Sequence, residues 1–188
     1  MADPRLAPAI ELASKYLAGI EPRWSHVQAV GRTAETICAA HGITIDLAAA
    51  AWLHDIGYAP QMAETGFHPL DGARFLASIG ATNLVVSLVA HHSGATFEAD
   101  ERGLAGELAE YPEPPDEISD VLVLIDMTTS PDGHRVSVDD RLTEILTRYP
   151  EDDPVHRAIV RSSDSLRQAA ARAAHRLGLA DVRGIPVL

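Results

Sequence analysis

The sequence has little cysteine, no long apolar run and no secretory leader pattern. Its single cysteine, Cys38, cannot form an internal disulfide, which favours a reducing compartment, and we expect Cys38 to be a small buried apolar residue. No apolar run approaches the ~20 residues that a membrane-spanning helix needs. Residues 1–8 lack the basic and apolar segments of a signal peptide. These absences predict a cytoplasmic protein that has no membrane partner.

Positive charge is also scarce. The chain has 15 Lys and Arg against 27 Asp and Glu, which gives a formal net charge of −12. Such a surface repels phosphate backbones, so polymeric nucleic acid is not an expected partner. A small anionic substrate would need a local positive site, which bound metal ions could supply.

Strand patterns are missing as well, because no alternation of apolar and polar residues extends beyond a few positions. Alanine is abundant and aromatic residues make up only 5% of the chain, a balance that favours helix. A length of 188 residues suits one domain, so we expect a single all-α domain over 1–188. The expected helices cover residues 7–18, 22–40, 47–55, 69–78, 83–92, 98–109, 116–127, 138–148 and 154–177, and a loose tail is expected from residue 178. Asp46 and Thr82 are the expected N-caps and Gly42 the expected C-cap for three of them.

Histidines are the feature that stands out in this chain. Five of the nine lie at or near the ends of expected helices in the first half: His26, His54, His68, His91 and His92. Asp55 follows His54 directly, and Asp126 lies in a later helix. Because helix ends can converge on one centre in a bundle, these side chains are candidate metal ligands.

Asp126 interrupts an apolar run over residues 121–125. A carboxylate in such a run is costly unless something pairs with it. A metal ion is one partner, and an arginine or a helix N-terminus is the other, so Asp126 alone does not decide between them.

The pair His54-Asp55 ends an alanine-rich apolar run, and an imidazole beside a carboxylate suits Fe, Mn, Zn or similar divalent ions. The alternative is a histidine that interacts favourably with a helix C-terminus, beside a partly exposed aspartate. His91 and His92 end another apolar helix. Both can ligate only if the helix loosens at residues 93–94, so we expect one of them to be a ligand rather than both.

Taken together and in order, these segments resemble the HD superfamily of metal-dependent phosphohydrolases, which is named for the adjacent His-Asp. The resemblance covers roughly residues 20–130, and order, spacing and helical context all agree. The matching segments are Arg23-Trp24-Ser25-His26, Leu53-His54-Asp55-Ile56-Gly57, His68-Pro69-Leu70-Asp71-Gly72-Ala73, Ala90-His91-His92-Ser93-Gly94 and Leu124-Ile125-Asp126-Met127.

The resemblance implies an HD-domain-like helical bundle that the helices after residue 135 complete. It places core ligands at His26, His54, Asp55 and Asp126, and two-metal members add histidines at positions matching His68 and His91 or His92. It further implies hydrolysis of a small phosphorylated metabolite or nucleotide by metal-activated water, with His54 and Asp55 in the catalytic centre. The expected cofactor is two divalent transition-metal ions, of Fe, Mn, Co, Ni or Zn.

Two departures from the sequence patterns of the family and two arginines bear on which substrate the protein would bind. The Gly-Tyr-Pro signature of the cyclic-dinucleotide phosphodiesterases is missing after His92, which argues against that branch. Many relatives carry lysine where Tyr58 stands, so one phosphate contact is lost. Arg23 lies one helical turn before His26 on the same face, where it could bind substrate phosphate or form a surface salt bridge. Arg74 is a weaker candidate for the same role.

Two other functions remain open at this point. Some HD-fold proteins use a similar ligand set in a di-iron site that activates oxygen, and ligands alone do not separate the two chemistries. A non-catalytic sensor or binding module would usually have lost a ligand, and no ligand is missing here.

Overall fold

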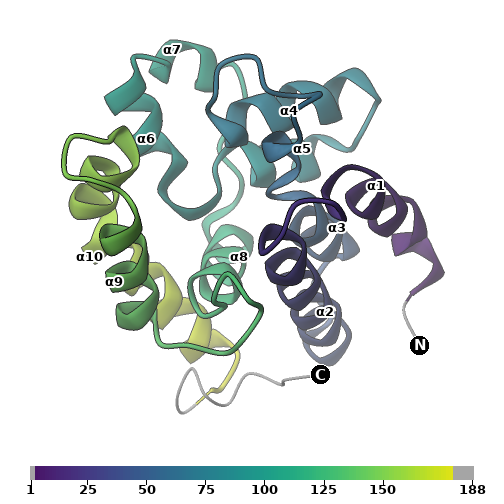
Figure 1. The fold of residues 1–188 in the computed structure, drawn as a ribbon. Helices are drawn as coiled ribbons and strands as arrows, with labels where there is room; N and C mark the ends of the chain where they lie inside the picture. The colour runs from purple at the N-terminus through teal and green to yellow at the C-terminus, as the bar shows by residue number, and fades with distance from the viewer. Residues whose placement is uncertain (1–2, 180–188) are drawn as a thin grey trace.

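The computed structural model describes residues 3–179, and helices make up most of that range (Figure 1). No strand occurs within residues 3–179, where an isolated bridge between Thr129 and Arg135 is the β feature present, so the predicted all-α fold is confirmed. None of the helices in this range is both long and apolar enough to cross a membrane. The expected tail starts at Gly178, and its residues 180–188 lie outside the described range.

The elements follow the predicted order with small shifts at their ends. They are α1 (Ala7–Leu17), α2 (Arg23–His41), α3 (Ile45–Leu53), α4 (His68–Ser78), α5 (Asn83–Ala90), α6 (Ala95–Arg102), α7 (Ala105–Leu108), α8 (Asp116–Met127), α9 (Val138–Arg148) and α10 (Pro154–Arg176), with 3-10 turns η1 (Pro4–Leu6), η2 (Ile56–Tyr58) and η3 (His92–Gly94). The single helix expected over residues 98–109 is wrong. Gly103, at a φ of 72°, ends α6, and α7 begins two residues later.

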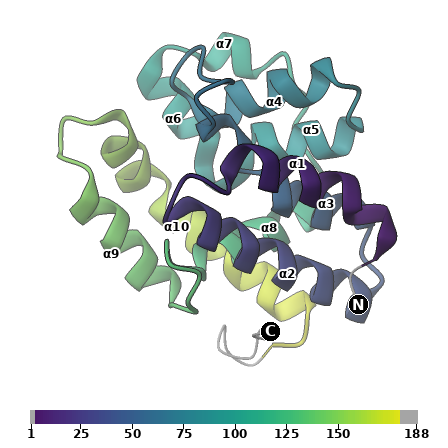
Figure 2. The same ribbon diagram turned by 45° about the vertical axis from the view of Figure 1, so that its right-hand side comes forward.

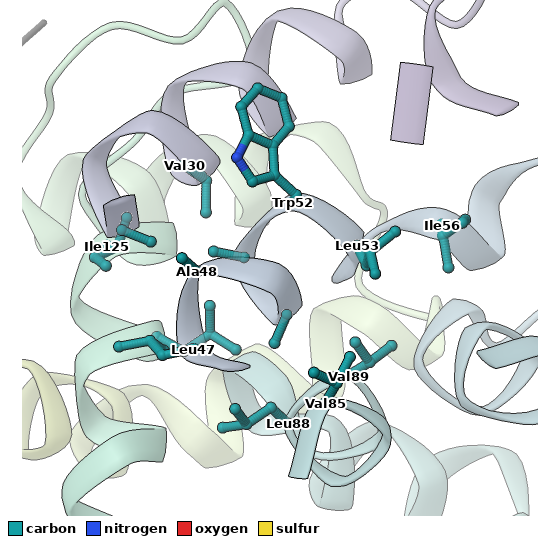
Figure 3. Packing of buried hydrophobic residues seen from close by; sticks show 14 of the residues in the cluster. Val30, Leu47, Ala48, Trp52, Leu53, Ile56, Val85, Leu88, Val89 and Ile125 are labelled. Atoms are coloured by element: carbon teal, nitrogen blue, oxygen red, sulfur yellow. The ribbon is translucent and has the colours of Figure 1, made fainter. Parts of the chain in front are cut away.

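The described residues form two hydrophobic cores. Helix α3 lies at the centre of the larger one and packs against α1, α2, α5 and α8. Figure 3 shows Leu47 and Ala48 of α3 facing Ile125 of α8, with Leu88 of α5 on the adjoining side. Three of the four alanines of α3, namely Ala48, Ala50 and Ala51, are fully buried, and their small side chains let neighbouring helices approach closely. At the end of α3, the indole of Trp52 donates a hydrogen bond to Glu35 over 2.8 Å. This packing fixes where the chain leaves α3.

The ends of α3 differ from the prediction in a way that matters for the site. Thr44 is the N-cap, because its side chain accepts from the N–H of Asp46, so the predicted cap at Asp46 is wrong. The helix then ends at Leu53, and His54 occupies the C-cap position. Asp55 follows at the start of a 3-10 turn, so His54 and Asp55 are freed from the strict helical spacing of their side chains.

The turn η2 lies directly against the start of α4. A Cβ on Gly57 would fall 2.0 Å from the carbonyl oxygen of His68, so this close approach requires glycine. The loop before α4 is held by the buried carboxylate of Asp71, which accepts from the backbone N–H groups of Thr65 over 3.0 Å and Gly66 over 3.1 Å. Together these contacts set the position of His68.

The C-terminal helices form a second layer beside α8. Helix α10 packs along α8, and α9 lies beside α10 and also contacts α8 (Figures 1 and 2). A separate apolar cluster joins them, in which Val123 and Met127 of α8 pack with Leu142 and Ile145 of α9 and Ile159 of α10. This layer covers one side of the converging helix ends that are described next.

Candidate metal centre

Five helix ends meet at one place, as the sequence pattern predicted. His26 lies in the first turn of α2 and His54 caps the end of α3. His68 is the first residue of α4, and Asp126 is next to last in α8. His92 follows α5 in the turn η3. All of these side chains except that of His68 are fully buried or nearly so, and His68 is partly buried.

The first cluster consists of His26, His54 and Asp126. The Nε2 atom of His26 lies 3.0 Å from Oδ1 of Asp126 and 3.3 Å from Nε2 of His54. The Nε2 atom of His54 lies 4.0 Å from the same Oδ1. Three potential ligand atoms therefore surround one small volume.

The second cluster consists of Asp55, His68 and His92. The Nε2 atom of His68 lies 3.1 Å from Nε2 of His92 and 3.3 Å from Oδ1 of Asp55. The other oxygen of the same carboxylate, Oδ2, lies 3.4 Å from Nε2 of His54 in the first cluster. Asp55 thus presents one oxygen to each cluster.

The tautomers of three histidines test whether these residues fit a metal ion. The Nδ1 atoms of His26, His54 and His92 lie 3.1, 2.9 and 2.7 Å from main-chain carbonyl oxygens of Ser130, Ala51 and Val89. A carbonyl can only accept, so each Nδ1 carries the proton, and in the neutral ring Nε2 carries the lone pair. In the first cluster, the lone pairs of His26 and His54 then face each other and Oδ1 of Asp126. A divalent cation fits this donor set, and main-chain carbonyls commonly orient metal-bound histidines in this way.

The charge states of the clusters agree with that fit. Burial lowers the pKa of His68 to about 3, although Asp55 opposes the shift, and burial together with His54 also lowers the pKa of His92. Burial raises the pKa of Asp55, but the charges of Arg23 and His54 outweigh it and hold that pKa well below its usual value. Neutral imidazoles and ionised carboxylates are the forms that bind metal ions.

Arg23 is one of the residues for which sequence left two roles open. Its guanidinium donates to Oδ2 of Asp55 over 2.6 Å and lies 4.0 Å from the ring centroid of Tyr58. The ring of Tyr58 in turn stacks on His68 at 4.0 Å between centroids. The salt bridge is therefore largely buried and directed at the site, since the Arg23 side chain is only 17% exposed.

Ser93 is a residue that the sequence reasoning did not assign to the site. It has a φ of 46° and a ψ of 44°, in the left-handed region that non-glycine residues seldom adopt. Its hydroxyl donates to Oδ2 of Asp126 in a short hydrogen bond. A strained backbone that carries a side chain into a cluster of candidate ligands is typical of functional sites.

Two other candidates, His91 and Arg74, lie away from the clusters. The ring of His91 contacts a different part of the chain from that of His92, because its Nε2 lies 2.9 Å from the carbonyl oxygen of Tyr111. Arg74 pairs with Glu107 and Glu64 instead of facing the site. Of the two adjacent histidines, the structure therefore brings His92 alone into a cluster, while the role of any of these side chains as a ligand stays a prediction.

A pocket opens beside the second cluster, and α9 and α10 form its far wall. Asp55, His68, His92 and Asp126 line its floor, and Arg141 and Tyr149 line the wall. The sequence reasoning did not assign Arg141 to the site, although its spacing marks it as a buried residue. It occupies a core-facing position between Val138 and Ile145 on the apolar face of an amphipathic helix.

Comparison with known families supports the resemblance. A family model described as the HD domain matches residues 23–130, more than half of the 188-residue chain. Neither the curated proteins nor the solved structures gave a match. The matched range begins at Arg23 and includes both clusters. The chain therefore belongs to the HD-domain family, the superfamily of metal-dependent phosphohydrolases.

Proposed function

We propose that this protein is a phosphohydrolase that uses two divalent transition-metal ions to cleave a small phosphorylated metabolite or nucleotide. The position of Asp55 is the observation that carries the proposal. One of its oxygens lies 3.4 Å from Nε2 of His54, and the other lies 3.3 Å from Nε2 of His68. A carboxylate between two sets of imidazoles is suited to bridge two ions.

His26, His54 and Asp126 would hold one ion, and His68 and His92 the other, with Asp55 shared. The bound ions would supply an activated water and neutralise charge on the phosphoryl oxygens. Because Arg23 already bonds to Asp55, its first role is to fix the orientation of that carboxylate. Its remaining N–H groups can reach an anion in the adjoining pocket, which Arg23 also lines.

The pocket favours phosphohydrolase over oxygenase chemistry. Three arginines line it, namely Arg23, Arg141 and Arg148, on a chain whose formal net charge is −12. A concentration of guanidinium groups on an otherwise acidic protein is suited to an anionic substrate such as a phosphate ester.

The test is phosphate release from a panel of phosphomonoesters, phosphodiesters and nucleotides by protein loaded in turn with Mn, Fe, Co, Ni and Zn. His54→Ala and Asp126→Asn should each lower the rate by more than about a hundredfold, since changes even to outer-shell partners cost 10–100-fold. His41→Ala, an exposed histidine at the far end of α2, is the matched control and should keep the wild-type rate. Oxygen uptake by the iron-loaded protein without phosphate release would overturn the proposal.

A further inference from the structure

Arg141 of α9 is buried although it carries a charge. Only 5% of the residue is exposed, and it lines the pocket above Asp126. The same pocket is lined by Asp55, His68, His92 and Asp126, so the guanidinium and the candidate ligands face one shared volume.

The hydrogen bonds of Arg141 are incomplete. Its Nη1 donates to Glu144 over 2.5 Å, whereas its buried Nε has no hydrogen-bond partner among the described residues. An unpaired buried N–H of a charged group costs free energy that a bound ligand can recover. Glu144 also lies 3.4 Å from Nε of Arg148, so one carboxylate orients both arginines of the wall.

Apart from its arginines, the wall formed by α9 and α10 is lined by apolar and aromatic side chains, and the pocket that it bounds is small. Ile145 and Tyr149 of α9 and Ile159 of α10 face the pocket, and the volume of the pocket is about 70 Å³. That is space for about five water molecules. A phosphate group alone fills such a volume, so the organic part of a substrate would lie against the apolar side chains of the wall.

We propose that Arg141 binds the phosphate of the substrate and that the wall formed by α9 and α10 restricts the enzyme to compact phosphomonoesters. This inference rests on the proposed function and narrows its substrate class. Both helices lie beyond the matched residues 23–130, so selectivity would come from a part of the chain outside the family match.

Binding of inorganic phosphate to the metal-loaded protein, measured by calorimetry, tests the role of Arg141 without requiring turnover. Hydrogen bonds to charged groups contribute about 1.5–3 kcal/mol, so Arg141→Met should weaken phosphate binding by about 10–100-fold. Arg141→Lys should recover part of the affinity. Arg161→Met is the matched control, because Arg161 lies on the exposed face of α10 and pairs with Asp100 and Glu101.

The metal content and melting temperature of each variant are measured as well. Wild-type values in Arg141→Met would show that its loss of phosphate affinity comes neither from unfolding nor from a missing metal ion. Equal phosphate affinity in wild type and Arg141→Met would overturn the assignment of Arg141, whether or not any ester is cleaved. If only the proposed phosphohydrolase function is wrong, the result is different. Phosphate binding would then depend on Arg141, but no ester in the panel would be hydrolysed.

Size selection has its own test in the values of kcat/KM for phenyl phosphate and adenosine monophosphate. Wild type should prefer phenyl phosphate by at least about tenfold, a difference of about 1.4 kcal/mol. Tyr149→Ala should reduce that preference, because it opens the wall while leaving both clusters intact. An equal or greater kcat/KM for adenosine monophosphate in wild type would overturn the size limit.

Discussion

Nε2 of His26 lies 3.3 Å from Nε2 of His54, and each ring already uses its Nδ1–H to bond a main-chain carbonyl. Two neutral rings in these tautomers would point lone pairs at each other. Nε2 of His26 also lies 3.0 Å from Oδ1 of Asp126, so lone pairs and a carboxylate oxygen crowd one small volume. A metal ion removes that conflict and adds bonds to both rings.

Metal binding should consequently stabilise the fold. At a free metal concentration of about 100 times Kd, a ligand that binds only the folded state adds about 2.7 kcal/mol. For a chain of this length we expect the melting temperature to rise by about 5–10 °C when metal is added to chelator-treated protein. Scanning calorimetry measures the shift, and His54→Ala should show a much smaller one. An equal shift in both proteins would mean that the ion binds elsewhere.

Adjacent His91 and His92 should behave differently, because their rings point to different partners. His92 lies 3.1 Å from His68, whereas His91 bonds the carbonyl of Tyr111. We expect His92→Gln to lose at least one metal ion per chain and His91→Gln to keep the wild-type content. Elemental analysis of the two purified variants measures this. Metal loss in His91→Gln with full retention in His92→Gln would reverse the assignment.

Much of the site was accessible from sequence because its ligands lie at the ends of helices that could be located. Asp126 was recognisable since a carboxylate interrupted an apolar run, and His54-Asp55 because a polar pair ended one. The sequence pattern could not decide between His91 and His92. That choice depends on where α5 ends, and the helix ends at Ala90, two residues before the expected end.

The pocket wall could not be predicted, since it depends on how α9 and α10 fold back over the site. Arg141 is distant in sequence from every candidate ligand. Its position on an apolar helix face marks it as buried, but only the packing of α9 and α10 beside α8 shows that it faces the clusters. The same holds for Ser93, whose backbone conformation has no clear sequence signal.

Substitutions of Ser93 should affect the stability of the protein and its activity in different ways. Ser93→Gly relieves a left-handed backbone that costs a non-glycine residue about 1–2 kcal/mol, but it also removes the hydroxyl that bonds Asp126. We therefore expect Ser93→Gly to unfold at the same or higher urea concentration than wild type, with lower activity. Ser93→Ala, which keeps the strain and loses the hydroxyl, should be the less stable of the two variants. Full activity in both would show that the hydroxyl has no positioning role.

The thiol of Cys38 should make stability depend on alkaline pH. Burial raises its pKa from 9.0 to about 11, so the folded protein holds the thiol proton more tightly than the unfolded chain does. The stabilising contribution is complete below the unfolded pKa and is lost as pH rises through the folded one. In urea titrations, the free energy of unfolding of wild type should therefore fall relative to that of Cys38→Ala between pH 9 and 11. A constant difference across this range would contradict the assigned burial.

Metal content per chain tests the central claim most directly. Protein stripped with a chelator, reconstituted with Mn, Fe, Co, Ni or Zn and desalted should retain two ions per chain. Asp55→Asn, which removes charge from the shared carboxylate, should retain fewer than two while it stays folded. Absence of any retained ion after reconstitution with each of these metals would contradict the metal centre on which the proposed function rests.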